Sequence, residues 1–243
     1  MSKDSKSCRA KPRVLGVIPA RGGSKRLKRK NIKTIIGHPL MAYTIWAAQK
    51  SKWLTDFVVS TEDIEILDIA RKYGASTPFV RPKELTTDTA RNVDVVLHAL
   101  AFMEKKKKLA YDIIILLQPT VPIRKASHID TAIKLLFESN EDTLASVKGP
   151  YQKRDPILKR IRNNILEEYC NNTEKKKNEP FYVYNASIYA VKRNYLLKEK
   201  KLISPRQVPL VMDQFHSIDI DTKDDFLMAE AVLKILKAHN YGD

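Results

Sequence analysis

The stretch at residues 14–31 reads VLGVIPARGGSKRLKRKN, and its two parts differ in chemical character. Residues 14–18 form a short, nearly continuous apolar run, which is typical of a strand buried on both faces of a parallel sheet. The part that follows is rich in Arg and Lys and carries Gly22 and Gly23 side by side. Ligands of open α/β sheets bind beyond the carboxyl ends of the strands. The stretch therefore predicts a buried strand that ends in a basic loop at a binding site.

Strand-like and helical segments alternate through the first 150 residues. Further strands are expected at 56–61, 111–119 and 144–149. Helices are expected at 39–51, 64–74, 92–108 and 126–138. This alternation favours right-handed βαβ units and predicts an α/β fold with a doubly wound, mostly parallel sheet. Beyond it come a polar, basic segment with weak strand character at 150–180, a strand at 181–191, and a strand running into a C-terminal helix at 217–236.

Length and composition favour one soluble domain. The chain has 243 residues, and no apolar run approaches the roughly 18 residues that span a bilayer. Residues 1–12 are polar, lack the apolar core of a signal peptide, and read as a flexible tail before a single domain at 13–243. Cys8 and Cys170 cannot supply a disulfide framework. We therefore expect a cytoplasmic protein with no membrane partner.

The net charge of +16 suggests a polyanionic partner. However, the lysine runs at 105–108 and 175–177 fall at an expected helix end and in a polar loop, where a solvated surface is the default explanation. The chain shows no RNP motif and no zinc-finger spacing. A basic nucleic-acid-binding protein is kept as the alternative of a different class, but no nucleic acid is expected.

The basic loop has the composition of a phosphate site. Gly22 lets the backbone approach a phosphate closely, and Arg21, Lys25 and Lys30 can neutralise a polyphosphate through charge-assisted hydrogen bonds. The spacing matches neither the P-loop nor the dinucleotide fingerprint GxGxxG. From residue types alone, a solvated basic loop is an equally open interpretation.

A pair of aspartates marks the stretch SIDIDT at 217–222. In a strand, Asp219 and Asp221 would share one face, because side chains alternate. Mg²⁺ takes one or two carboxylates and completes its shell with substrate phosphates and water. In the alternative, Asp221 or Thr222 caps the last helix, which explains one of these residues but not Asp219. The metal site is the favoured interpretation.

Two more stretches place polar side chains at or within expected strands. In LLQPTVPIR, at 116–124, prolines stiffen the turn after a buried strand, and Gln118 offers both a donor and an acceptor. In YNASIY, at 184–189, Asn185 and Ser187 interrupt an apolar strand, either for a ligand or as satisfied core groups. No GxSxG elbow or Cys–His pairing indicates covalent catalysis. The basic loop and the aspartate pair together indicate nucleotidyl transfer, which relies on positioning and charge neutralisation.

Six motifs occur in the order found in the acylneuraminate (CMP-sialic acid or nonulosonic acid) cytidylyltransferases. They are IPARGGSKRLKRKN, VSTEDIEI, FVRPKELTTDTA, LLQPTVPIR, YNASIYAV and SIDIDTKDDFLMAE. The chain resembles this family from about residue 14 to the C-terminal helix. The resemblance implies a nucleotide-diphospho-sugar transferase fold, a homodimer and dependence on Mg²⁺. It also implies transfer of CMP from CTP to a nine-carbon keto-acid sugar, with release of pyrophosphate.

The resemblance also implies roles for individual residues. It assigns nucleotide binding to Arg21, Ser24, Lys30, Asn31, Arg81 and Asn92, and the loop composition adds Gly22 to this set. It assigns sugar binding to Gln118 and to the motif that Asn185 opens, and Thr120, Arg124 and Ser187 in the same two stretches complete the predicted sugar-binding set. It assigns metal binding to Asp219 and Asp221, and catalysis to these two with Lys30 and Arg21. In relatives the segment at 150–180 reaches the partner subunit, so it is the expected dimerisation insert.

Departures from the family pattern leave the sugar open. Where relatives have NGA, this chain has Asn185, Ala186 and Ser187, and no arginine lies between Arg162 and Asn185, where sialic acid enzymes carry sugar-binding arginines. N-acylneuraminate and a bacterial analogue such as legionaminic acid are both compatible. A Kdo cytidylyltransferase of the same fold is the alternative, although TTDTAR replaces the SGTDR-like stretch expected there. The intact loop and aspartate pair disfavour a non-catalytic member of the fold.

Overall fold

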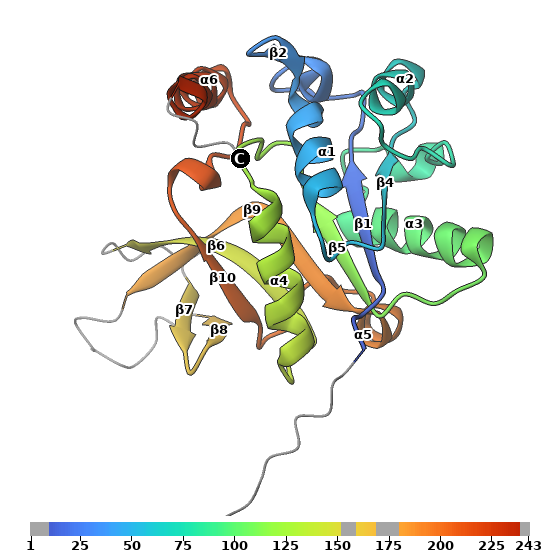
Figure 1. Ribbon diagram of the computed structural model, residues 1–243, viewed down its shortest axis with the longest axis vertical. Helices are drawn as coiled ribbons and strands as arrows, with labels where there is room; N and C mark the ends of the chain where they lie inside the picture. Colours follow the sequence, from blue (N-terminus) through green and yellow to red (C-terminus); the bar gives the residue numbers. More distant parts are fainter. Residues whose placement is uncertain (1–9, 152–158, 169–179, 239–243) are drawn as a thin grey trace, which may run out of the picture.

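The computed structural model describes residues 10–151, 159–168 and 180–238, and a central sheet in it carries helices on both faces (Figure 1). The strands of this sheet, in spatial order, are β10 (Val208–Met212), β6 (Thr143–Tyr151), β9 (Phe181–Lys192), β5 (Ile113–Leu117), β1 (Val14–Pro19) and β4 (Asp56–Ser60). The α-helices are α1 (Leu40–Lys50), α2 (Ile64–Lys72), α3 (Asn92–Lys107), α4 (Ala126–Glu138), α5 (Arg193–Glu199) and α6 (Lys223–Ala238). Shorter elements are the 3-10 helices η1 (Lys30–Ile32), η2 (Lys83–Leu85) and η3 (Phe215–Ser217), and the strands β2 (Thr34–Ile35), β3 (His38–Pro39), β7 (Lys159–Arg162) and β8 (Ile165–Glu168).

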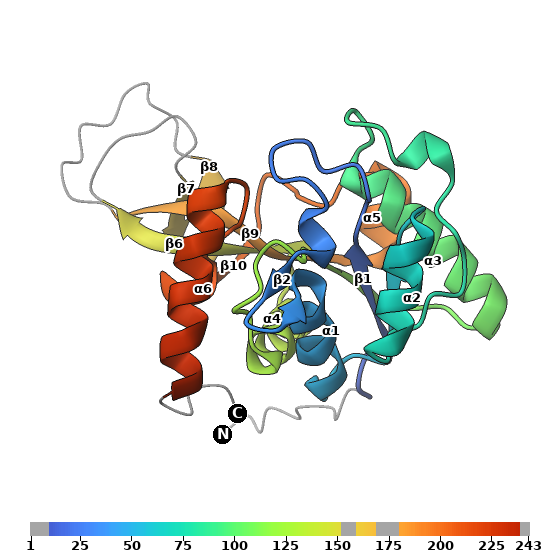
Figure 2. The same ribbon diagram turned by 90° about the horizontal axis from the view of Figure 1, so that it is seen from above.

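The expectation of a doubly wound, mostly parallel sheet is confirmed. Strand β1 pairs in parallel with both β4 and β5, and β10 pairs in parallel with β6. Side chains of β1 alternate between two cores: Val14 and Ile18 pack with α1, α2 and α4, whereas Leu15 and Val17 pack with α3 and α5. The helices therefore cover both faces, as the continuous apolar run of β1 predicted (Figure 2).

Strand β9 departs from the simple alternation. It runs antiparallel to both of its neighbours, β5 and β6, in the middle of the sheet. A parallel return from β6 would need a crossover connection, usually a helix, whereas an antiparallel strand does not. The described part of the intervening segment is the β7–β8 hairpin, which pairs with β9 through Lys159 and Tyr182. The weak strands predicted in the insert are thus present, while 152–158 and 169–179 lie outside the described residues.

The prediction of a strand at the start of 217–236 is wrong. The chain there forms η3 and then an irregular segment up to the first residue of α6. The backbone N–H of Ile220 donates to the carbonyl of Thr120, and those of Asp221 and Thr222 donate to the side chain of Asp225. These bonds take the place of a strand ladder, so the face-sharing geometry expected for Asp219 and Asp221 does not apply.

Strand β10 and helix α5 were not predicted from the sequence. Strand β10 contains Pro209, which weakens a strand signal but is tolerated at an edge, and β10 pairs at the sheet's edge with β6. Among the described residues, no helix combines the length and the apolar character needed to cross a bilayer.

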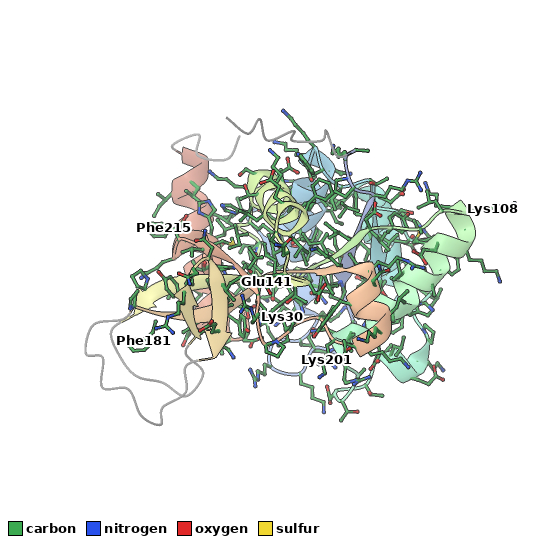
Figure 3. All side chains as sticks on the ribbon, turned by 90° about the horizontal axis from the view of Figure 1, so that it is seen from below. Lys30, Lys108, Glu141, Phe181, Lys201 and Phe215 are labelled. Carbon is green, nitrogen blue, oxygen red and sulfur yellow. The ribbon has the colours of Figure 1, made fainter. Side chains whose placement is uncertain are left out.

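The described lysine run lies on the outer surface. Lys105, Lys106 and Lys107 form the last turn of α3, where cations interact favourably with the helix dipole, and Lys108 ends it. Figure 3 shows Lys108 at the rim of the molecule, far from Lys30 near its centre. This placement agrees with the solvated-surface interpretation. The run at 175–177 lies outside the described residues.

Candidate active site

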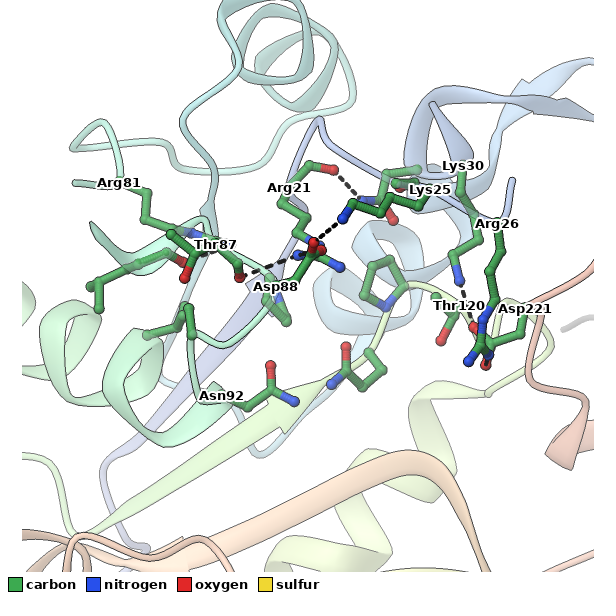
Figure 4. A pocket seen from close by; sticks show the side chains of 18 residues that line it. Arg21, Lys25, Arg26, Lys30, Arg81, Thr87, Asp88, Asn92, Thr120 and Asp221 are labelled. Carbon is green, nitrogen blue, oxygen red and sulfur yellow. Dashed lines mark hydrogen bonds and ion pairs between the residues drawn. The ribbon is translucent and has the colours of Figure 1, made fainter. Parts of the chain in front are cut away.

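A cavity of about 490 Å³ opens beyond the carboxyl ends of β1 and β5, the position expected for a ligand in an open α/β sheet (Figure 4). It brings together residues from the basic loop, the η2 region, the start of α3, the end of β5 and the segment before α6. The predicted site residues that line it are Arg21, Ser24, Lys30, Asn31, Arg81, Asn92, Gln118, Thr120 and Asp221. Residues far apart in the sequence therefore meet at one site.

The basic loop is already paired with an internal carboxylate. Arg21 Nη1 lies 2.9 Å from Asp88 Oδ1 and donates to the carbonyl of Thr87 at 3.2 Å, and Lys25 forms an ion pair with the same Asp88. The hydrogen bond from Lys25, followed by the attraction of both cations, holds the pKa of Asp88 below its usual value. Asp88 thus occupies the place that an anionic ligand would take beside these two cations. Sequence reasoning missed it, although TTDTA places an acid among turn residues.

Lys30 connects this loop to the opposite wall. Its Nζ donates to Asp221 Oδ1 at 2.9 Å and to the carbonyl of Ile220 at 2.6 Å, and its side chain is only 13% exposed. Arg26 reaches the other oxygen of Asp221 at 3.2 Å. Arg26 is a second lining residue that the sequence analysis did not assign. Two cations therefore converge on one half-exposed carboxylate.

Asp219 lies beside Asp221 in a more buried setting. Burial raises the pKa of Asp219 and the negative charge of Asp221 raises it further, whereas a hydrogen bond from Thr120 opposes the shift. Its Oδ1 is buried with no hydrogen-bond partner among the described residues. A buried carboxylate oxygen without a donor, next to a second carboxylate, is a position at which a bound cation would be favourable. Within the described part of the chain, no group of three or more His, Cys, Asp or Glu side chains forms a fuller metal site.

Gly22 and Asn31 fix the conformation of the basic loop through hydrogen bonds. The N–H of Gly22 donates to Glu62 Oε1 at 2.8 Å, and a Cβ at this position would lie only 2.4 Å from Asp63 Oδ2. Asp63 caps α2, so only glycine lets the loop pass the start of that helix. Asn31 Nδ2 donates to the carbonyl of Arg21 at 2.9 Å, which fixes the loop from its other end. Gly22 therefore acts through backbone fit rather than by lining the cavity.

Arg81 lines the cavity and is held by hydrogen bonds to the end of β4. Its Nε donates to Ser60 Oγ at 3.1 Å, and its Nη2 donates to the carbonyl of Ser60 at the end of β4. Burial lowers the pKa of Arg81 to about 10. Asn92, in contrast, is exposed at the first turn of α3 and lines the cavity. Of these two predicted nucleotide contacts, Asn92 is the one whose side chain is freely accessible.

The predicted sugar-binding residues divide into two groups. Gln118 and Thr120 line the cavity at the end of β5. Arg124, Asn185 and Ser187 are buried and do not line it, so their predicted sugar contacts have no direct support from this cavity. Asn185 accepts from Ser146 at 2.5 Å and donates to Ser217 at 2.9 Å, so it is a satisfied core residue. Ala186, at the glycine position of relatives, has a φ of +57°, the left-handed conformation that glycine adopts without strain.

Comparisons with known proteins agree with this geometry. The Cytidylyltransferase family matches residues 15–232. The CMP-N,N'-diacetyllegionaminic acid synthase of Legionella pneumophila is 34% identical over 92% of this chain and 97% of its own length. The N-acylneuraminate cytidylyltransferase of Escherichia coli is 31% identical over 89% of this chain and 51% of its own length.

A solved structure of CMP-2-keto-3-deoxy-manno-octonic acid synthetase complexed with CTP superimposes with a TM-score of 0.73. It covers 91% of this chain and 98% of its own, and at 17% sequence identity it supports the fold alone. The match to the family over most of the chain, together with the close relatives, shows that this chain belongs to the cytidylyltransferase family.

Proposed function

We propose that the protein activates a nonulosonic acid by transferring CMP from CTP to the anomeric hydroxyl of the sugar, with release of pyrophosphate. The observation that carries this proposal is the cavity in which the Arg21 loop, Lys30 and Asp221 converge, with Asp219 buried next to Asp221. The relatives' names support the sugar class, since they are a CMP-N,N'-diacetyllegionaminic acid synthase, an N-acylneuraminate cytidylyltransferase and a pseudaminic acid cytidylyltransferase.

The basic side of the cavity fits a triphosphate. Arg21, Lys25, Arg26 and Lys30 line it, and their present partners are the carboxylates of Asp88 and Asp221. Phosphate oxygens can replace those carboxylates with charge-assisted hydrogen bonds of the same kind. Asn92 and Arg81 also line the cavity, and we assign to them the selection of the base or the ribose, because a site built around polar groups rejects analogues that lack them.

We propose Mg²⁺ as the cofactor, held by Asp219 and Asp221. Two carboxylates are the usual protein share of a magnesium shell, and the unpartnered oxygen of Asp219 is a fitting ligand. When bound, Mg²⁺ would neutralise phosphate charge and lower the pKa of a coordinated hydroxyl. For Asp221 to serve, its oxygens must be released from Lys30 and Arg26.

A single displacement fits the cavity better than a covalent intermediate. Its lining, among the described residues, contains no cysteine and no histidine that could activate its hydroxyl groups, and its lysines, Lys25 and Lys30, form ion pairs with Asp88 and Asp221. The anomeric hydroxyl would attack the α-phosphorus in line while Arg21 and Lys30 neutralise the charge that grows on the phosphate oxygens. Gln118 and Thr120 would hold the sugar at the end of β5.

We further propose that the active form is a cytoplasmic homodimer in which the insert at 150–180 contacts the partner subunit. The described part of this insert, the β7–β8 hairpin, lies at the β6 side of the sheet, away from α1, α2 and α3 (Figure 2). It contributes no residue to the cavity. A Kdo cytidylyltransferase is the second candidate, supported by the fold of the CTP-complexed structure.

A panel assay separates these candidates. CTP and Mg²⁺ are mixed with the protein and, in turn, N-acetylneuraminate, N,N'-diacetyllegionaminate, a pseudaminic acid or Kdo, and the CMP-sugar is identified by mass. We expect a product with at least one nine-carbon acid. A product with Kdo alone would favour the second candidate, and no product with any sugar would contradict the proposed function.

A further inference from the structure

A second cavity, of about 620 Å³, lies outside the candidate active site and shares no lining residue with it. It is bordered by α1, the turn between β2 and β3, the start of α4 and the C-terminal half of α6. Its volume is within the range of small-molecule sites. Nothing in the proposed transfer of CMP uses it.

One wall of this cavity is apolar and aromatic. The ring of Trp46 makes edge contacts with His38 at 4.8 Å and with Tyr43 at 5.4 Å between ring centroids. Ile123 and Leu233 add aliphatic surface. An apolar body, and an aromatic one in particular, would find complementary surface here.

The other wall carries a buried cation without an acidic partner. The Arg124 side chain lines the cavity and is only 3% exposed. Its Nη atoms donate to the carbonyls of Gln118 and Ser187 and to Thr44 Oγ1, whereas its Nε has no partner. Among the described residues no carboxylate pairs with it, and burial lowers its pKa to about 9. A buried charge that lacks a counter-ion is costly, so an anion at this place would be strongly favoured.

Further features at this end of the cavity also favour an anion. Ala126 and Ser127, the first residues of α4, line it, and the N–H groups at a helix start have no intrahelical partner and carry the positive end of the dipole. Lys50 and Lys125 add positive charge, and the described lining contains no Asp or Glu. His216 Nε2 is a second buried nitrogen without a partner.

We propose that this cavity is a binding site for a small carboxylic acid with an apolar, aromatic body. The carboxylate would bind at the N–H groups of the start of α4, next to the uncompensated charge of Arg124, and the ring would pack against Trp46 and Leu233. The proposal follows from the combination of one apolar wall with a cationic end whose described lining holds no carboxylate; Asp213 lies outside this lining and pairs with His216 Nδ1 at 2.6 Å.

The fluorescence of Trp46 gives a direct test. The chain has two tryptophans, and Trp53→Phe leaves Trp46 as the only one. This variant is titrated with phenylacetate and with phenylacetamide, its neutral analogue of nearly the same shape. We expect a saturable fluorescence change with phenylacetate, and an affinity at least about ten-fold weaker for the amide, because charge-assisted hydrogen bonds are lost. No saturable change, or equal affinities for the two compounds, would overturn the proposal.

Replacement of Ser127 tests the anion end without disturbing the core. In the same background, Ser127→Asp places a carboxylate in the first turn of α4, which a helix tolerates well, whereas Ser127→Asn is the neutral control. We expect Ser127→Asp to weaken phenylacetate binding at least about ten-fold. The Asn variant should bind phenylacetate nearly as the parent does. Equal affinities of the two variants for phenylacetate would show that the site does not select an anion and would overturn the proposal.

Discussion

Lys30 Nζ lies 2.9 Å from Asp221 Oδ1, although the two residues are separated by most of the chain. The contact ties the loop after the first strand to the segment before the last helix, across the mouth of the cavity. The same ammonium donates to the carbonyl of Ile220, so Lys30 holds the segment before α6 at two neighbouring residues. We expect the phosphate oxygens of an incoming triphosphate to replace the Asp221 carboxylate at Lys30.

Lys30→Ala should therefore lower turnover more than it weakens CTP binding. By analogy with the loss of one preorganised transition-state donor, we expect turnover to fall roughly a hundred- to a thousand-fold, with a smaller change in KM for CTP. Lys28→Ala is the matched control, because Lys28 is exposed in the same loop and does not line the cavity. Unchanged turnover with a raised KM would make Lys30 a ground-state binding residue.

Asp88 should act as an internal competitor of the triphosphate. Asp88→Asn frees Arg21 and Lys25 from their present partner, so KM for CTP should fall by about two- to five-fold, the scale of exposed ion pairs. Asp68→Asn breaks an exposed ion pair with Arg71 on α2, away from the cavity, and serves as the control. If KM rose in Asp88→Asn, the carboxylate would instead help to arrange the loop for CTP.

Asp219→Asn should raise stability at neutral pH while it lowers turnover. The pKa of Asp219 is raised by burial, so the native state holds its proton more tightly than the unfolded chain. Stability therefore decreases as pH rises from the unfolded pKa, about 3.9, to the raised native value, and an ionised Asp219 is unfavourable above that window. The thermal midpoint of the variant should exceed that of the parent at pH 7, and the gain should shrink in acid.

Asp224→Asn is the control for this comparison, since Asp224 is an exposed acid in the first turn of α6. Its removal should slightly lower the midpoint through loss of a favourable dipole interaction. If Asp219→Asn were the less stable variant at pH 7, Asp219 would carry a structural role that the geometry does not reveal.

Shortening the insert at 150–180 tests the proposed dimer. A variant in which a short glycine-serine linker joins β6 to β9 leaves the described cavity lining intact. Light scattering should report a dimer for the parent and a monomer for the variant. A variant that remained a dimer would place the subunit contact elsewhere on the molecule.

The positions of strands and helices along the chain could be predicted from the sequence more fully than their arrangement in space. The apolar runs of β1 and β5 and the helical spacing of α1, α2, α3 and α4 were sufficient to place them within a few residues. The direction of β9 was not readable, because it depends on how the chain returns from the insert rather than on local propensity.

The same limit applies to the candidate site. Motif positions found Lys30, Gln118 and Asp221 correctly as cavity residues. Arg124 was predicted to bind the sugar together with Gln118 and Thr120, yet its Nη atoms donate to the carbonyls of Gln118 and Ser187. Asp88 was missed because its role depends on two cations that approach it from a distant loop. Such roles arise from tertiary contacts, which spacing alone does not contain.

The most direct measurement is the ratio of pyrophosphate to CMP-sugar when CTP, Mg²⁺ and a nonulosonic acid are mixed with the protein. A single displacement in this cavity predicts equal amounts of both products and no pyrophosphate in the absence of the sugar. Release of pyrophosphate without sugar, together with CMP attached to the protein, would contradict it.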